Sequence, residues 1–332
     1  MSVFDAQLGI KQESEYNTPV AVDAWYEFLK ETVRGKYERL ESAGLRSGRK
    51  FARSDRWLPY LKECGGDIEF DVLSTGFETL LSALLGGWDD TSALSPGVPG
   101  GVKRWVATAD SFVGRSFTVQ VGRPDVEDTV YPCTYGGGKV TDFEISNDAD
   151  GLLVLSTAWD FASEQLGTGA GALALQTADY PDGGELFSFL GGTVKVDDDE
   201  FFTHKVSVKV DNGLKTDRHF ISQADWKGAA IEDTPRKIEW ELEAEFDGLD
   251  QVNRVASATV DGATASLHLV WQAPTVITGS THPQVIVDIP CGRFDDEIPT
   301  VDGAKLLDQK LSGVGLDNGT DEPITITYIT AD

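Results

Sequence analysis

Cysteine, histidine, positive charge and long hydrophobic runs are all scarce in this sequence. The three cysteines, Cys64, Cys133 and Cys291, are odd in number, lie far apart and form no Cys-x-x-Cys pair. This usage is typical of small buried side chains in a reducing compartment, and it argues against a disulfide framework.

Membrane and export signals are missing as well. No stretch reaches the roughly 18 consecutive apolar residues of a membrane-spanning helix. Residues 1–12 lack the basic end and the apolar core of a signal peptide. We therefore expect synthesis in the cytoplasm and no membrane partner.

Positive charge is outnumbered two to one. The chain carries 28 Lys and Arg against 55 Asp and Glu, a net charge of −27 over 332 residues. Such a surface repels the phosphates of nucleic acids, which argues against a sequence-reading DNA-binding protein. The length suffices for one large β domain or for two smaller units.

Motifs of catalysis and of metal binding are also absent. The four histidines show no HxxH or HExxH spacing, and no GxSxG nucleophile motif occurs. The glycines of 136–139 and of 167–171 do not complete a phosphate loop or a dinucleotide fingerprint. Residues 147–151 resemble the centre of an EF-hand without its distal Glu. The sequence predicts no enzyme activity, no cofactor and no metal ion.

What the sequence has in abundance is apolar–polar alternation. Residues 238–246 place five apolar side chains on one face of a strand and four glutamates on the other: Glu239, Glu241, Glu243 and Glu245. Shorter alternating runs, separated by Gly and Asn turns, occur at 68–72, 117–121, 206–210, 267–271 and 324–328. This pattern predicts a mainly β protein with antiparallel sheets packed as a sandwich or closed as a barrel.

One helix is predicted over about residues 75–85. Thr75 and Glu78 have the spacing of a capping box, and Gly86 follows as a terminator. Leucines and a phenylalanine then form one apolar stripe: Phe77, Leu80, Leu81, Leu84 and Leu85. The helix is expected to flank a sheet, with long irregular loops at 86–103 and 160–185.

Basic residues concentrate between Arg34 and Arg56. In a chain of this net charge, the natural target for a basic segment is another copy of the same protein. A solvated basic loop is the alternative.

Several ordered segments resemble the tail tube (major tail) proteins of long-tailed bacteriophages. They are Glu13–Val20, Ser42–Arg46, Gly66–Val72, Gly76–Gly86, Ser116–Gly122 and Tyr135–Val140. Asn17 replaces a usual Gly, and it too tolerates a left-handed backbone; Asp67 replaces a usual Ser. The C-terminal half fits more loosely, at Val206–Leu214 and Ile324–Tyr328. Each motif is short, and their shared order carries the resemblance.

The resemblance implies a structural β-sandwich with a flanking helix that forms closed rings, usually of six subunits, stacked into a hollow tube. The implied partners are further copies of the chain, a tape measure protein, and tail terminator and tip proteins. Genome DNA would pass through without specific binding. The implied location is the virion tail, after synthesis in the host cytoplasm.

Two surfaces become candidates for assembly. Ring-to-ring contact is expected from the N-terminal arm (about residues 1–20) and from the basic loop with Arg46, Arg49, Lys50 and Arg53. The four glutamates of 238–246 are candidates for lining the lumen, where negative charge would repel the passing DNA. An outward, solvated face is the equal alternative for them.

Other interpretations remain open at this stage. They are a phage decoration or baseplate protein, a carbohydrate-active β-sandwich hydrolase and a lectin-like module. For domains, we expect the arm of residues 1–20 and one β domain over 21–332, with a possible sub-boundary near 190. Two related halves would permit three subunits per ring, but the sequence shows no convincing internal repeat.

Overall fold

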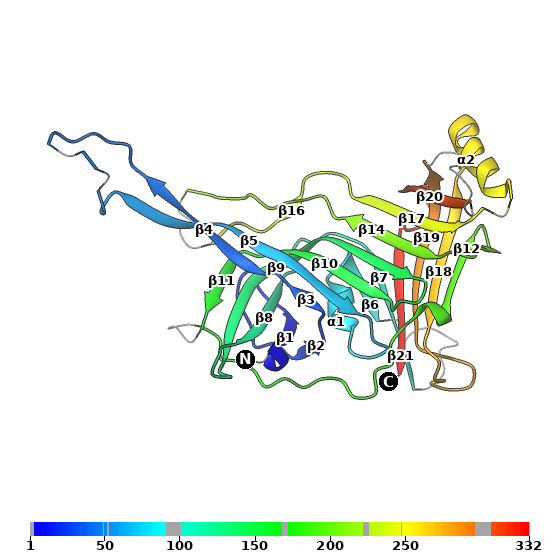
Figure 1. Ribbon diagram of the computed structural model, residues 1–332, viewed down its shortest axis with the longest axis horizontal. Helices are drawn as coiled ribbons and strands as arrows, with labels where there is room; N and C mark the ends of the chain where they lie inside the picture. Colours follow the sequence, from blue (N-terminus) through cyan, green and yellow to red (C-terminus); the bar gives the residue numbers. More distant parts are fainter. Residues whose placement is uncertain are drawn as a thin grey trace.

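The computed structural model describes residues 3–48, 50–51, 53–90, 101–167, 172–221, 226–246, 248–295 and 307–331. Within these ranges the chain is mainly antiparallel β-sheet with two short α-helices (Figure 1). Neither helix is long and apolar enough to cross a membrane.

The first part of the chain contains eleven strands, a short α-helix α1 (Glu78–Ser82) and a 3-10 turn η1 (Val3–Asp5). The strands are β1 (Gln7–Gln12), β2 (Ala24–Tyr26), β3 (Lys30–Glu31), β4 (Arg34–Glu41), β5 (Trp57–Asp71), β6 (Gly86–Asp90), β7 (Val102–Ala109), β8 (Phe117–Pro124), β9 (Val130–Asp148), β10 (Val154–Asp160) and β11 (Ser163–Leu166).

The second part contains ten strands, the helix α2 (Asp250–Asp261) and a 3-10 turn η2 (Phe189–Gly191). The strands are β12 (Gly192–Val196), β13 (Asp199–Glu200), β14 (Lys205–Asp211), β15 (Leu214–Lys215), β16 (Ile231–Glu232), β17 (Lys237–Glu245), β18 (Ala265–Gln272), β19 (Gln284–Phe294), β20 (Asp308–Gly315) and β21 (Thr325–Ala331).

Alternating sequences form the strands as predicted. In β17 the apolar side chains Ile238, Trp240 and Leu242 are buried while the glutamates between them face solvent. The same period recurs in β14 and β18. These inward faces join one continuous apolar core that draws on both parts of the chain. The predicted mainly β fold is confirmed.

Strand β9 connects the layers of the fold. Its first half pairs with β8 and β11, and its second half pairs with β10 and β14. Between the halves stands Gly137 with φ +69°, a conformation that glycine adopts at little cost. A Cβ there would also lie 2.7 Å from the methyl group of Ala162. The strand bends at this glycine and so serves two sheets.

The predicted helix of residues 75–85 is shorter than expected, and its predicted capping box is wrong. Helix α1 spans only Glu78–Ser82, and no side chain caps its N-terminus. The hydroxyl of Thr75 is buried without a hydrogen-bond partner. Gly76, with φ +81°, turns the chain away, and the Tyr26 hydroxyl accepts a hydrogen bond from the Leu80 N–H at 3.1 Å. A tertiary contact therefore replaces the local cap, while the leucines of the stripe are buried as predicted.

Helix α2 was not predicted. Its sequence is largely polar, and Val255 and Ala258 are the buried apolar residues described on it. It ends at Gly262, whose φ of +69° is the left-handed cap that glycine commonly provides. The prediction of a single flanking helix was therefore incomplete.

The two long loops differ from one another. The loop expected over 160–185 instead begins with strand β11 (Ser163–Leu166), which pairs with β9. Residues 172–185 are free of helix and strand, as predicted, and residues 168–171 lie outside the described residues. The segment expected as a loop at 86–103 instead begins with β6, which pairs with β7. Residues 91–100 between these strands lie outside the described residues.

Candidate assembly surfaces

The hairpin of β4 and β5 extends away from the body of the molecule and is the most prominent feature of its outline (Figure 1). Register pairing holds Arg34 opposite Gly65 and Glu41 opposite Trp57, so the ladder continues far beyond the core. The connection at its tip, residues 42–56, is the predicted basic loop.

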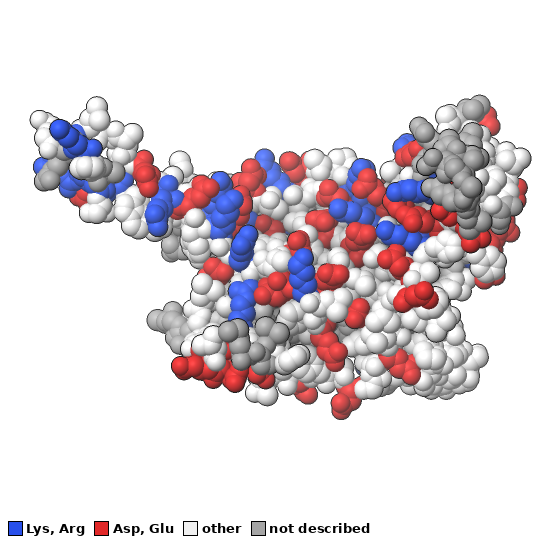
Figure 2. Space-filling model, viewed as in Figure 1, with Lys and Arg blue, Asp and Glu red and all other residues white. Residues whose placement is uncertain are grey.

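The structure brings the described members of the basic loop together. Arg46, Lys50 and Arg53 line one open hollow with Phe51 at the tip, and basic side chains gather there in the space-filling view (Figure 2). Arg53 donates to both carboxylate oxygens of Asp55, at 2.7 and 2.5 Å. Arg49, predicted with them, lies outside the described residues.

The same hairpin also exposes large apolar side chains. They are Tyr37, Leu40, Leu45, Phe51, Trp57 and Leu58, with Leu45 fully exposed and Phe51 at 90%. Exposed apolar side chains gathered in one place mark a surface that another molecule covers. The hairpin thus combines positive charge and apolar area, which suits contact with the acidic body of another copy.

The four predicted lumen glutamates lie on the solvent face of the large sheet. Charges of alternating sign follow Glu239 across the strands: Lys209 of β14 lies beside it, and Glu144 of β9 lies beyond that lysine. Glu241 accepts a hydrogen bond from Lys310 at 2.7 Å, and this bond lowers the pKa of Glu241. Lysines therefore relieve the repulsion expected between four like charges on one strand.

This face extends over several strands as continuous rows of side chains. One row crosses β3, β5, β10, β9, β14, β17, β20 and β19 in that order. Its members are Lys30, Glu69, Ser156, Glu144, Lys209, Glu239, Val314 and Arg293. The surface is polar and mixed in charge, without an apolar patch in this row.

Part of the predicted N-terminal arm lies inside the folded body. Strand β1 pairs with β2 and β8, and Leu8 and Ile10 are fully buried. The following turn contains Asn17 with φ +55°, the left-handed conformation expected for a residue that replaces glycine. Phe4, at 93% exposure, lies before the strand. A contact between rings by this segment stays a prediction.

A buried carboxylate holds the N-terminal turn in place. Glu13 is 3% exposed and accepts hydrogen bonds from the hydroxyls of Ser116 and Thr118, at 2.6 and 2.9 Å. It also accepts from the N–H groups of Asn17 and Gly137, at 3.0 and 2.9 Å. The first tail-tube-like segment is thus tied to the bend of β9.

Replacing this carboxylate should destabilise the chain. In Glu13→Gln an amide N–H₂ must face two donors, so we expect a loss of about 2–3 kcal/mol in the free energy of unfolding, measured by urea denaturation. Glu15→Gln in the same turn, where the side chain is exposed, should change it by less than about 0.5 kcal/mol. Equal stability of the two variants would contradict the assigned role.

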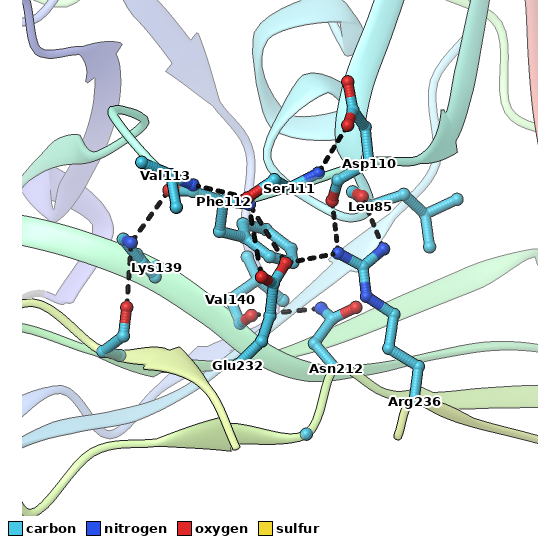
Figure 3. A network of polar contacts seen from close by, with 12 residues as sticks. Leu85, Asp110, Ser111, Phe112, Val113, Lys139, Val140, Asn212, Glu232 and Arg236 are labelled. Carbon is cyan, nitrogen blue, oxygen red and sulfur yellow. Dashed lines mark hydrogen bonds and ion pairs between the residues drawn. The ribbon is translucent and has the colours of Figure 1, made fainter. Parts of the chain in front are cut away.

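A second network fastens the connection between β14 and β17 to the body (Figure 3). The Arg236 guanidinium donates to the Leu85 carbonyl at 2.8 Å, to the carbonyl of Asp110 and to the Glu232 carboxylate at 3.1 Å. Lys139 is 4% exposed and donates to two backbone carbonyls, those of Phe112 and Ala230, both at 2.9 Å. Burial lowers the pKa of this lysine.

Sequence reasoning found the segments that contain Glu13 and Lys139 but not what these side chains do. Both belong to the tail-tube-like motifs, and both prove to be buried polar groups that join distant strands. For Lys139 the available signal was a charged residue among Gly and β-branched neighbours; the neighbours of Glu13 are polar and gave no such signal. Apart from Asn17, the hydrogen-bond partners of Glu13 and Lys139 lie 27 to 124 residues away along the chain.

The comparisons with known proteins agree with this architecture. A family model described as "Phage tail tube protein" matches residues 4–315, which covers nearly the whole chain. No curated protein matches the chain. The family is structural and non-enzymatic, and its members form part of the virion tail. The chain belongs to the phage tail tube protein family.

Proposed function

We propose that this chain assembles into closed rings that stack into the hollow tube of a phage tail, and that genome DNA passes through the tube. The observation that carries the proposal is the β4–β5 hairpin, with its exposed apolar side chains and basic tip on a body of net charge −27. A free monomer gains nothing from such a projection, whereas an assembly buries it.

Within this proposal the hairpin tip crosses from one ring to the next. Arg46 and Lys50 are exposed and lie at the far end of the hairpin, where the acidic surface of a stacked copy can meet them. Head-to-tail contacts of this kind propagate a filament when they connect rings. Contacts with a tape measure protein and with terminator and tip proteins at the two tube ends belong to the same proposal.

The sheet face with Glu239, Glu241, Glu243 and Glu245 lines the lumen in this proposal. Opposite to it lies the apolar core, so this face is the one available to water. A lining with a surplus of carboxylates repels a polyanion from every side and keeps it centred. The intervening lysines reduce this field without inverting it.

Electron microscopy of the purified protein tests the proposal. Rings or tubes of uniform diameter are expected, at least on raising protein concentration. Persistent monomers in all conditions of salt and concentration would contradict it.

A change of the lumen charge has a separate expected result. Replacing Glu239, Glu241, Glu243 and Glu245 by Lys should leave tubes intact but make them retain short duplex DNA added during assembly, because the lining then attracts phosphates. Sedimentation of tubes with labelled DNA measures retention. A matched variant with Gln at the same four positions should retain far less DNA. Equal retention by the unmodified protein, the Lys variant and the Gln variant would contradict a lumen position for this face.

A further inference from the structure

The strand pairings of the chain repeat. In the first part, neighbouring strands follow the order β1-β8-β9-β10-β5-β4, and β11 pairs with β9. In the second part, they follow the order β12-β18-β19-β20-β17-β14, and β21 pairs with β19. Every pairing is antiparallel, and the corresponding elements also follow one another in the same order along the chain.

The helices obey the same correspondence. Helix α1 follows β5, the second strand of the first hairpin, and α2 follows β17, the second strand of the other. Strands β5 and β17 carry similar alternations of apolar and acidic residues: Ile68-Glu69-Phe70-Asp71 in β5 and Ile238-Glu239-Trp240-Glu241 in β17. Strands β6 and β7 are an insertion in the first part. We define the first unit as β1–β11 and the second unit as β12–β21.

In the part of the chain that the structure describes, two strand pairings join the units: β7 pairs with β21, and β14 pairs with β9. Strand β14, the outer strand of the second unit's hairpin, pairs with the second half of β9, from Lys205 opposite Asp148 to Asp211 opposite Asp142. It occupies the edge of β9 beyond Gly138, where the pairing with β8 ends. The outer hairpin strand of one unit thus completes the central strand of the other.

The corresponding edge of the second unit lacks such a partner within the described chain. Strand β18 pairs with β19 as far as Ala265 opposite Gly292. Beyond that point the described pairing of β19, from Arg293 to Phe294, is with β20 on the other side. This is the position that β14 occupies beside β9.

The corresponding outer strand of the first unit is also an edge. Among the described residues, β3 and β4 pair with β5 and with no other strand. This edge is mixed in charge: it carries Lys30, Arg34, Lys36 and Arg39 together with Glu31, Glu38 and Glu41. An uncovered edge strand is a template for pairing with another chain.

We infer that the β3–β4 edge of one copy pairs with the end of β19 in the next copy, as β14 pairs with β9 inside each chain, and that three chains close each ring. This inference rests on the proposed tube function and specifies its subunit contact. Each chain supplies eight strands to one closed barrel, in the order β4-β5-β10-β9-β14-β17-β20-β19. The contact is head-to-tail, and such contacts close a ring when the rotation from one subunit to the next is an exact fraction of a full turn.

The width of the cargo sets the smallest number of chains in a ring. Strands lie about 4.8 Å apart and tilt by roughly 40° in a barrel, so eight strands span about 50 Å of circumference. Two chains would leave about 22 Å between the side chains of opposite walls, which a duplex of about 20 Å fills without room for water. Three chains leave about 38 Å. Three is the smallest number that lets solvated DNA slide.

Engineered cysteines test the contact. In the row of side chains across the large sheet, Lys30-Glu69-Ser156-Glu144 of the first unit matches Lys209-Glu239-Val314-Arg293 of the second. Glu144 lies opposite Lys209 inside the chain, so the corresponding pair between copies is Arg293 and Lys30. We expect Lys30→Cys/Arg293→Cys tubes, on oxidation, to yield covalent oligomers that end at three chains in denaturing electrophoresis. Each single variant should give no such ladder. Ser146→Cys/Ser207→Cys, which bridges opposite residues within one chain, should stay monomeric.

Each outcome decides something different. A ladder that ends at three chains, with six similar units per ring in electron micrographs, supports the inference. Tubes with a ladder that ends at six chains overturn the subunit number, and tubes without cross-links overturn the contact, while both leave the tube function standing. If the unmodified chain forms neither rings nor tubes, the proposed function fails and the inference fails with it.

Discussion

Reversing three charges at the hairpin tip, with Arg46→Glu, Lys50→Glu and Arg53→Glu, is expected to abolish tube formation and to leave the fold intact. None of the described side chains of the tip belongs to the apolar core. Its only described ion pair, between Arg53 and Asp55, is partly exposed, and such pairs contribute about 0–1 kcal/mol. The reversed tip would meet the acidic surface of a stacked copy with like charge.

Sedimentation and electron microscopy measure tube formation, and thermal unfolding of the monomer measures the fold. A charge-conserving variant, Arg46→Lys/Lys50→Arg/Arg53→Lys, is the matched control and should still form tubes. Added salt shortens the range of the repulsion to about 3 Å at 1 M, so it should partly restore assembly of the reversed variant. If the reversed variant formed tubes with normal salt resistance, the tip would not be the contact between rings.

Sequence predicted the strands well where one face of the sheet meets water. In β17, Glu239 and Glu241 alternate with Trp240 and Leu242, and that period is visible without any knowledge of partners. The sequence pattern did not reveal the length of the β4–β5 hairpin. Tyr37 and Leu40 are exposed in the single chain, so the apolar residues of this segment do not follow the buried face of a core strand.

The failures at the helices have a common cause. The N–H of Leu80 is satisfied by Tyr26, which is 54 residues away, and no local rule can find such a partner. Helix α2 was missed because its few buried side chains, Val255 and Ala258 among them, form too short a stripe to stand out. In both helices, contacts with distant parts of the chain determined where the helix forms.

The sequence predicted some features of the proposed assembly surfaces and not others. Arg46, Lys50 and Arg53 gather at one tip as the sequence indicated, because residues near in sequence stay near at the end of a hairpin. That Glu239 to Glu245 lie on a solvent face is confirmed, whereas their place in a lumen stays a prediction. The repeat of strand order escaped sequence reasoning because it lies in ladder pairings between distant residues and in few shared letters.

A buried ion pair carries the second large prediction. Lys227 is 2% exposed, and its ammonium group donates to the carboxylate of Asp160. Removing the lysine in Lys227→Met leaves a carboxylate buried without its counter-charge. We expect the free energy of unfolding at pH 8 to fall by about 3–5 kcal/mol, measured by urea denaturation. The exposed Lys215→Met is the matched control and should change it by less than about 0.5 kcal/mol.

The pH dependence separates loss of the ion pair from loss of packing. Burial raises the pKa of Asp160 to about 6, although Lys227 acts against this shift. A carboxyl with a raised pKa in the folded state binds its proton more tightly there than in the unfolded chain, so its ionisation costs stability as pH rises towards 6 and this cost persists above. Loss of the lysine increases that cost, and the deficit of Lys227→Met should shrink when pH falls from 8 to 5. The double variant Asp160→Asn/Lys227→Met, which buries no charge at this site, should recover most of the loss at pH 8. A deficit that stays constant with pH and persists in the double variant would show that the lysine acts through its packing rather than its charge.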